Sequence, residues 1–328
     1  MLHVTFAALA WLGRQGTRAV AALVFIGLAL PPLDALLRPY VGEAIFVLLC
    51  IAFLRVEPNR LRHQLRRPGI VLTATLWTML AIPWLFGASC LLIGLDHSAP
   101  DLFLGLMLQA VASPMMSAPA FAALMGLDTT LTLVTLVAST ALTSTTAPFF
   151  AYLFLGPALP LSPVALGLKL LLILAGALSV AVILRWLVGP TAIMSYRESI
   201  DGFNVIILFV FVAAVMENVG TRVVAEPWRM IALAVLAFGT VLVVLALTAL
   251  VFARAGASHA FALGLVASQR NMGLMLAATA RDLPDLVWLY VAFCQFPIYL
   301  LPHLLKPLAR RVTRAESAAA VVRSAVAD

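Results

Sequence analysis

The stretch SHAFALGLVASQRNMGLMLAATA, residues 258–280, decides how this chain can fold. Its two flanks are apolar over a length that suits a membrane-spanning helix, which needs about 20 residues. Its middle, Ser268-Gln269-Arg270-Asn271-Met272-Gly273, is polar and carries a charge. A charged side chain at mid-bilayer costs at least about 2.5–3.5 kcal/mol, so it usually marks a substrate or ion path. The alternative interpretation is that Arg270 only ties helix ends together by donating to their free carbonyls.

A second apolar run, residues 102–125, is interrupted by Ser113-Pro114-Met115-Met116-Ser117-Ala118-Pro119. Each proline removes a backbone donor and clashes with the preceding turn. In lipid, the freed carbonyls must be satisfied by protein or water. This pattern predicts either a kinked packing helix or an unwound segment that lines a binding cavity.

The composition places the whole chain in the membrane. Of its 328 residues, 63% are hydrophobic and 11% are charged, against about half and a quarter in soluble domains. We therefore predict an all-α membrane protein with ten transmembrane helices. Their expected ranges are 19–37, 41–55, 69–94, 102–125, 129–155, 163–188, 200–219, 228–253, 258–280 and 284–305.

The basic residues predict the orientation. With ten spans, both termini share one side, and most of the 21 lysines and arginines fall there. Cytoplasmic loops carry this excess, so we expect a multi-pass protein of the inner (plasma) membrane with both termini cytoplasmic. The net charge of +7 is thus explained by topology and does not indicate a nucleic-acid partner. The four basic residues expected on the opposite side are Arg38, Arg222, Arg229 and Arg281.

Five spans followed by five spans place the two halves in opposite orientations, which is the inverted repeat of many secondary transporters. A weak internal echo agrees, because Val111-Ala112-Ser113 recurs as Val266-Ala267-Ser268 in the equivalent span. The predicted division is an N-terminal interfacial segment, a first repeat, a second inverted repeat and a cytoplasmic tail. Their ranges are 1–18, 19–155, 163–305 and 306–328.

Hydroxyl side chains recur at helical spacing along the fifth predicted span. They share one helix face and are Thr132, Thr135, Ser139, Thr143 and Thr146. A matching stripe of Gln109, Ser113 and Ser117 lies on the fourth span. Such hydroxyls either bond their own helix carbonyls and glue helices together or face a polar site.

The sequence offers no enzyme signature. It has no HExxH, P-loop or nucleophile-elbow motif and no Cys/His metal cluster, so we expect neither an enzyme nor an ATP-driven pump. The three cysteines, Cys50, Cys90 and Cys294, fall inside apolar runs and predict packing residues rather than disulfides.

The chain resembles the bile acid:sodium symporter superfamily along nearly its whole length. The features that match are a basic loop over residues 55–68, Pro83 in span three, Ser113-Pro114 in span four, a Thr/Ser-rich span five ending at Pro148, and Arg270-Asn271-Met272-Gly273-Leu274 in span nine. The resemblance implies ten helices, of which the fourth and ninth are unwound where they cross. It also implies a core domain that moves against a panel domain, and organic anions as substrates.

The sodium ligands of that family are largely missing here. Where sodium-coupled members have a Ser-Asn pair, this chain has Pro119-Ala120, and where they have a Glu it has Val266. A family glutamine in span three corresponds to Thr78, and the glutamine of a Gln-Asn pair corresponds to Arg270, with Asn271 retained. We therefore expect no cofactor, and a sodium ion would find few of its usual ligands.

These observations predict a secondary transporter of a small organic anion that works by alternating access without obligatory sodium. Arg270 would supply the positive charge that sodium supplies in the similar proteins. The predicted binding residues are Ser113, Pro114, Ser117, Pro119, Thr132, Thr135, Ser268, Gln269, Arg270 and Asn271. Alternatives are a proton-coupled or efflux carrier, with Glu217 or His303 as proton groups, and a non-transporting membrane sensor.

Overall fold

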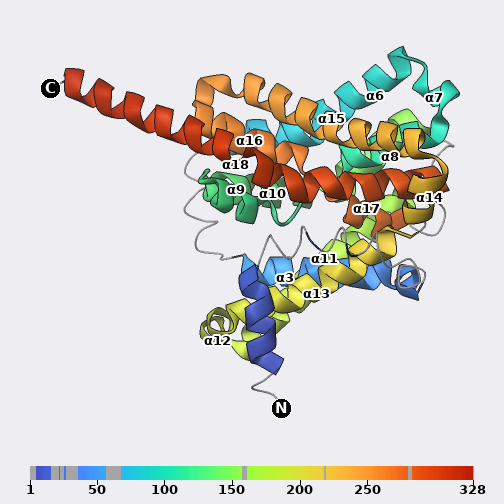
Figure 1. Ribbon diagram of the computed structural model, residues 1–328, viewed down its shortest axis with the longest axis horizontal. Coiled ribbons are helices and arrows are strands. Elements are labelled where there is room, and N and C mark those ends of the chain that lie inside the picture. Colours follow the sequence, from blue (N-terminus) through green and yellow to red (C-terminus); the bar gives the residue numbers. More distant parts are fainter. Residues whose placement is uncertain are drawn as a thin grey trace.

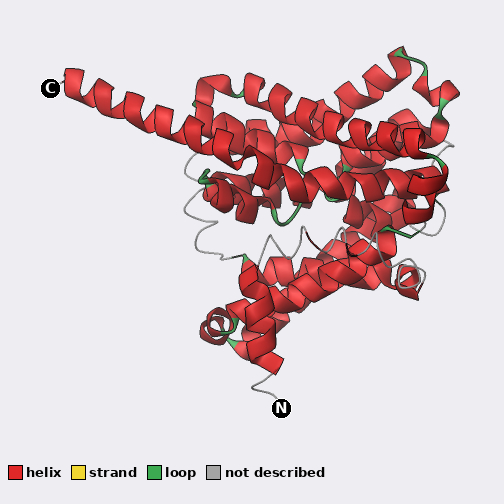
Figure 2. Ribbon diagram, viewed as in Figure 1, coloured by secondary structure: helices red, strands yellow, loops and turns green. Residues whose placement is uncertain are grey.

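The computed structural model describes residues 5–15, 22, 26, 36–56, 68–156, 161–217, 219–279 and 283–327. Within these ranges the regular structure is helical, without a β-strand (Figure 2). The first predicted span, 19–37, lies almost entirely outside the described residues, as do Asn218, Arg281 and most of the basic loop after span two.

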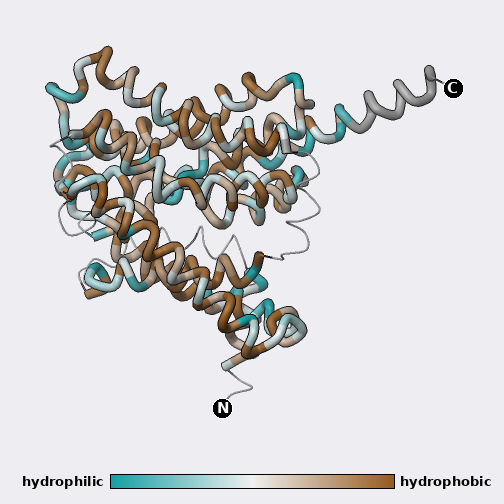
Figure 3. The backbone as a smooth tube through the Cα atoms, turned by 180° about the vertical axis from the view of Figure 1, so that it is seen from behind, coloured by the Kyte–Doolittle hydropathy of each residue, from teal (hydrophilic) through white to brown (hydrophobic). Residues whose placement is uncertain are grey.

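Six helices are long and apolar enough to cross a membrane. They are Gly69–Leu92, Thr129–Leu155, Pro163–Val188, Arg197–Val215, Pro227–Val251 and Asp285–Glu316. This agrees with the prediction of an all-α membrane protein, and Figure 3 shows hydrophobic residues along most of these helices. The count of ten spans and the inverted relation of the two halves stay predictions.

Two predicted spans fall short of that length because each is split into two helices. The fourth divides into α8 (Pro100–Val111) and α9 (Ala118–Met125). The ninth divides into α16 (Ala257–Ser268) and α17 (Met272–Thr279). The second span is α3 (Val41–Arg55), a single continuous helix of 15 residues.

The helices pack in two layers (Figure 1). In the first layer, α3 packs against α11 (Pro163–Val188) and α13 (Arg197–Val215), and the short α12 (Pro190–Ser195) joins the last two. Residues 5–15 form a helix that lies on the start of α13, where Arg14 pairs with Glu198 at 2.8 Å. The predicted N-terminal interfacial segment thus contains a helix.

The second layer holds the split helices and the long helices around them. It contains α8, α9, α16 and α17, together with α10 (Thr129–Phe150), α15 (Pro227–Val251), α18 (Asp285–Ala327) and a span made of α5 (Pro68–Leu76), the π-helical turn η2 (Trp77–Ala81) and α6 (Ile82–Leu92). Short elements complete the chain: η1 (Arg38–Tyr40), α7 (Leu95–Ser98), η3 (Ala151–Leu155), α14 (Val219–Ala225) and η5 (Ala253–Ala255).

The layers meet through α10, which packs against α11, through α17, which packs against both α3 and α11, and through contact of α18 with α13. At Gly273, in the first turn of α17, an added Cβ would lie 3.3 Å from Phe211 of α13 and 3.4 Å from Ile45 of α3. The missing side chain therefore lets the start of α17 approach the first layer closely.

The C-terminal segment differs from a simple tail. The tenth predicted span ends at residue 305, but α18 continues as helix to Ala327 and projects beyond the layers (Figure 1). Prolines at Pro297, Pro302 and Pro307 lie inside α18. The three cysteines are buried and free, which confirms their predicted role as packing residues.

Candidate functional site

The two split helices meet at their breaks. After α8 ends, Ala112 turns to an extended conformation, and Gln269 does the same after α16. The backbone N–H of Asn271 donates to the carbonyl of Ser113 at 2.8 Å, and the backbone N–H of Met115 donates to the carbonyl of Gln269 at 2.7 Å. Two short extended segments therefore cross side by side in antiparallel orientation.

Pro114 and Arg270 face each other across this crossing as an isolated bridge pair. The two backbone hydrogen bonds come from their neighbours, so neither residue of the pair needs its own N–H for the crossing. Proline fits this position because a backbone N–H at residue 114 would have no partner in the crossing. The sequence break at Pro114 thus ends α8 without leaving the crossing unpaired.

The guanidinium of Arg270 is enclosed by backbone carbonyls. The residue is 3% exposed, and its Nη1 donates to the Ala112 carbonyl at 2.8 Å while Nη2 donates to the Thr78 carbonyl at 3.0 Å. Among the described residues, no carboxylate forms an ion pair with it. Its Nε has no hydrogen-bond partner within the described part of the chain. A buried positive charge therefore has no counter-ion among the residues that the structure describes.

The Thr78 carbonyl is free to accept this bond because of the π-helical turn η2. In an ordinary α-helix it would accept from Ile82, but the Ile82 N–H donates to Trp77 instead. The next residue is Pro83, which has no N–H. The π-helical turn and the proline together release one carbonyl, and Arg270 occupies it.

Four helix ends surround the crossing. The C-terminal ends of α8 and α16 present partial negative charge, and the N-terminal ends of α9 and α17 present partial positive charge. Arg270 binds the end of α8 through Ala112, whereas Asn271 accepts from the Leu274 N–H at 3.1 Å and so caps α17. The positive ends of α9 and α17, together with Arg270, favour an anion over a cation.

Several polar atoms near the breaks are buried without a hydrogen-bond partner among the described residues. At the crossing they are the hydroxyls of Ser113 and Ser117 and both amide atoms of Gln269, and α10 adds the hydroxyls of Thr135, Ser139 and Thr140. Helix α10 packs against α9, α16 and η2. An unpaired buried polar group costs about 1–3 kcal/mol, so a concentration of them is typical of a site that receives a polar partner.

The predicted binding residues differ in the contacts that they make. The structure brings together Ser113, Pro114, Gln269, Arg270 and Asn271 at the crossing. Pro119 lies in the first turn of α9, where a proline is well tolerated. The hydroxyls of Thr132 and Ser268 donate to carbonyls of their own helices, at Thr129 and Leu265.

The predicted stripe of Gln109, Ser113 and Ser117 is interrupted. A stripe needs a continuous helix, and α8 ends at Val111. Gln109 instead accepts a hydrogen bond from the Tyr290 hydroxyl of α18. The sequence analysis did not predict the pair of Gln109 with Tyr290 or the role of the Thr78 carbonyl. Of the two, only the free carbonyl could have been found from the sequence, because Pro83 has no N–H to donate to it.

Two backbone carbonyls at the crossing are not free to bind a cation. Sodium takes oxygen ligands, yet the carbonyls of Ala112 and Thr78 already accept from the guanidinium of Arg270. Within the described ranges, no three His, Cys, Asp or Glu side chains come together in a group that could hold a metal ion.

Comparison of the chain with models of protein families and with curated proteins gives no match.

Proposed function

We propose that the protein is a secondary transporter of a small organic anion, and that it works by relative movement of the two helix layers without obligatory sodium. The observation that carries the proposal is the buried guanidinium of Arg270, which has carbonyl partners but no counter-ion in the described part of the chain. An anionic substrate would neutralise this charge and would meet the unpaired polar groups of Ser113 and Gln269.

The helix arrangement supports a carrier over a sensor. Many carriers build a binding site inside the membrane from helices that are interrupted near the bilayer midplane. The crossing belongs to the second layer, and α17 places it directly against the first layer. The resemblance to the bile acid:sodium symporter superfamily agrees with organic anions as the substrate class. Proton coupling through Glu217 has less support, because Arg38 holds that carboxylate at 2.5 Å.

A thermal-shift experiment tests the proposal. Purified protein is heated with pyruvate, pantoate or taurocholate, in sodium and in choline buffers of equal chloride concentration. A ligand at 100 times its Kd stabilises the folded state by about 2.7 kcal/mol. We expect at least one anion to raise the melting temperature equally in both buffers, and the same anion to enter proteoliposomes. A shift that needs sodium would overturn the sodium-independent mechanism.

Two variants of Arg270 locate the site. Arg270→Gln removes the charge, and we expect it to lose the anion-dependent shift. Arg270→Lys keeps the charge, although a lysine cannot donate to both carbonyls in the manner of the planar guanidinium, so it should keep a reduced shift. Arg229→Gln serves as the control, because Arg229 is exposed and pairs with Glu226 at 3.0 Å. An unchanged shift in Arg270→Gln would place the anion elsewhere.

A further inference from the structure

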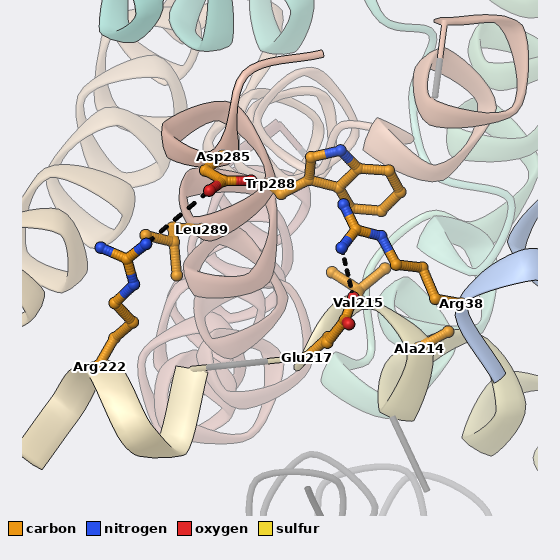
Figure 4. A pocket seen from close by; sticks show the side chains of 8 residues that line it. All are labelled: Arg38, Ala214, Val215, Glu217, Arg222, Asp285, Trp288 and Leu289. Atoms are coloured by element: carbon orange, nitrogen blue, oxygen red, sulfur yellow. Dashed lines mark hydrogen bonds and ion pairs between the residues drawn. The ribbon is translucent and has the colours of Figure 1, made fainter. Parts of the chain in front are cut away.

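At the end of the molecule where α13 stops and α18 begins, Arg38 lies between two partners (Figure 4). Its Nη1 donates to the Glu217 carboxylate at 2.5 Å. Its guanidinium carbon lies 4.8 Å from the centre of the Trp288 ring. The carboxylate therefore fixes the guanidinium while its face remains available to the indole, which is the arrangement of a cation–π contact.

This contact joins the two layers. Arg38 belongs to η1, directly before α3, and Glu217 lies in the turn after α13, so both belong to the first layer. Trp288 belongs to α18 of the second layer. Separation of the layers at this end would break the contact between Arg38 and Trp288 but would leave the pair of Arg38 with Glu217 intact.

A second ion pair lies beside the first contact. Arg222 of α14, the helix that connects the layers, lies 3.8 Å from the Asp285 carboxylate at the start of α18. Arg222 also pairs with Glu226 at 3.3 Å. Figure 4 shows Arg222 and Arg38 on opposite sides of a small pocket.

The pocket itself is too small and too well neutralised to hold an organic anion. Its volume is about 30 Å³, and its lining includes Ala214 and Val215, which are 1% and 2% exposed. Each arginine that lines it already has a carboxylate partner, at Glu217 and Asp285. A volume this small and arginines already paired do not suit a ligand site.

We infer that Arg38, Glu217 and Trp288 form a gate that holds the two layers together at this end and must open when the layers separate. We name this group the Arg38 gate. The inference rests on the proposed function, because a carrier has to open at each end in turn. The polar contacts at the other end differ in kind. Arg55 pairs with Asp201 inside the first layer at 2.5 Å, and His259 lies 3.5 Å from Asp128 inside the second.

Cysteine accessibility tests the gate without any substrate. Ala214→Cys places a thiol in the buried lining of the pocket, in a background where the three native cysteines are replaced by alanine. The protein is held in nanodiscs, so that both faces are open to reagent, and the rate of modification by a maleimide is measured. The thiol reacts only when the gate opens.

We expect Arg38→Gln to raise the modification rate about tenfold, because it removes the cation that binds Trp288. Trp288→Leu keeps Arg38 paired with Glu217 and should also raise the modification rate. If Arg38→Gln does not fold, Trp288→Leu alone tests the gate. The control is Arg229→Gln, which removes an equal charge at the same end but whose partner, Glu226, lies three residues away in sequence. It should stay within about twofold of the parent.

The inference is overturned if both gate variants react at the parent rate, or if Arg229→Gln accelerates the reaction as much as they do. Failure of the proposed function has a different signature. It would appear as the absence of any anion-dependent thermal shift, whereas the cysteine rates would still report the gate.

Discussion

The guanidinium of Arg270 donates to the carbonyl of Thr78 at 3.0 Å, across 192 residues of sequence. The bond exists because two features coincide. A π-helical turn moves the Ile82 N–H to Trp77, and Pro83 supplies no N–H in its place. A deformation in the helix over Gly69–Leu92 thereby prepares the acceptor for a charge carried by the segment between α16 and α17.

This relationship predicts a coupling between Pro83 and Arg270. In Pro83→Ala, the new N–H competes with Arg270 for the Thr78 carbonyl, so the change should be unfavourable in the parent protein. In an Arg270→Gln background, the Thr78 carbonyl has lost its donor, and the new N–H of Pro83→Ala replaces it. Pro83→Ala should therefore stabilise the folded protein in that background. The sign of the effect should therefore reverse, with a coupling energy of about 0.5–3 kcal/mol.

Thermal unfolding of the two single variants and the double variant in detergent measures this coupling. Pro148→Ala is the control, because Pro148 also lies inside a transmembrane helix, α10, just before the π-helical turn η3. Its effect should add to that of Arg270→Gln within about 0.3–0.5 kcal/mol, as expected for independent sites. Additivity at Pro83 would refute the role of the released carbonyl.

A second prediction concerns the residue next to Arg270. Asn271 caps α17 through its side-chain oxygen, and aspartate is an equally good cap. Asn271→Asp should therefore keep the thermal stability while it adds a negative charge at the crossing. That charge would act as an internal counter-ion for Arg270, so the anion-dependent thermal shift should be lost.

Asn271→Ala separates the two roles of this position. It removes the cap and should cost about 0.5–2 kcal/mol of stability, yet it leaves Arg270 without a counter-ion and so should keep the anion-dependent shift. Thermal-shift measurements on both variants, with the anion that stabilises the parent, make the comparison. A full response in Asn271→Asp would argue against an anion site beside Arg270.

The sequence was sufficient to predict the positions where two of the apolar helices break. Pro114 and the polar group around Arg270 lie where α8 and α16 end, because proline and buried polar residues are local signals. Their pairing across the crossing could be expected only from the family resemblance. No local pattern says which carbonyl a side chain meets 158 residues away, as Arg270 meets Ala112.

The hydroxyl residues were harder to judge from sequence. Thr132 and Thr143 lie on the same helix face as Thr135, yet they bond carbonyls of their own helix, whereas the Thr135 hydroxyl is buried without a partner among the described residues. Helical periodicity assigns a residue to a face but does not tell whether its hydroxyl turns back to the i−3 or i−4 carbonyl. The choice is made by the packing of α10 against its neighbours.

The contact between the layers at Gly273 gives a third prediction. Because a Cβ there would already lie 3.3 Å from Phe211 and 3.4 Å from Ile45, the branched side chain of Gly273→Val cannot fit without moving α17 away from the first layer. Overpacking of this kind costs about 1–3 kcal/mol. Gly239→Val in α15 is the control, since no atom lies within 4 Å of an added Cβ there. Thermal unfolding should separate the two variants, and equal melting temperatures would contradict the close approach.

The last prediction uses two tyrosines of α18 whose side chains are both buried. Tyr290 donates to Gln109 of α8, whereas the hydroxyl of Tyr299 has no partner among the described residues. Tyr290→Phe leaves the Gln109 oxygen buried and unpaired, so it should cost about 1–3 kcal/mol. Tyr299→Phe removes a hydroxyl that makes no bond, so it should be neutral or stabilising.

The double variant Tyr290→Phe with Gln109→Leu supplies the internal check on this interpretation. Replacement of both partners by apolar groups of similar shape can be nearly neutral, so the second substitution should recover much of the stability that the first one lost. Denaturation of all four proteins in the same detergent gives the comparison. If Tyr299→Phe proved as damaging as Tyr290→Phe, the cost would come from the small void left by the buried hydroxyl and not from a lost hydrogen bond. In that case the bond between Gln109 and Tyr290 would not be what holds α8 to α18.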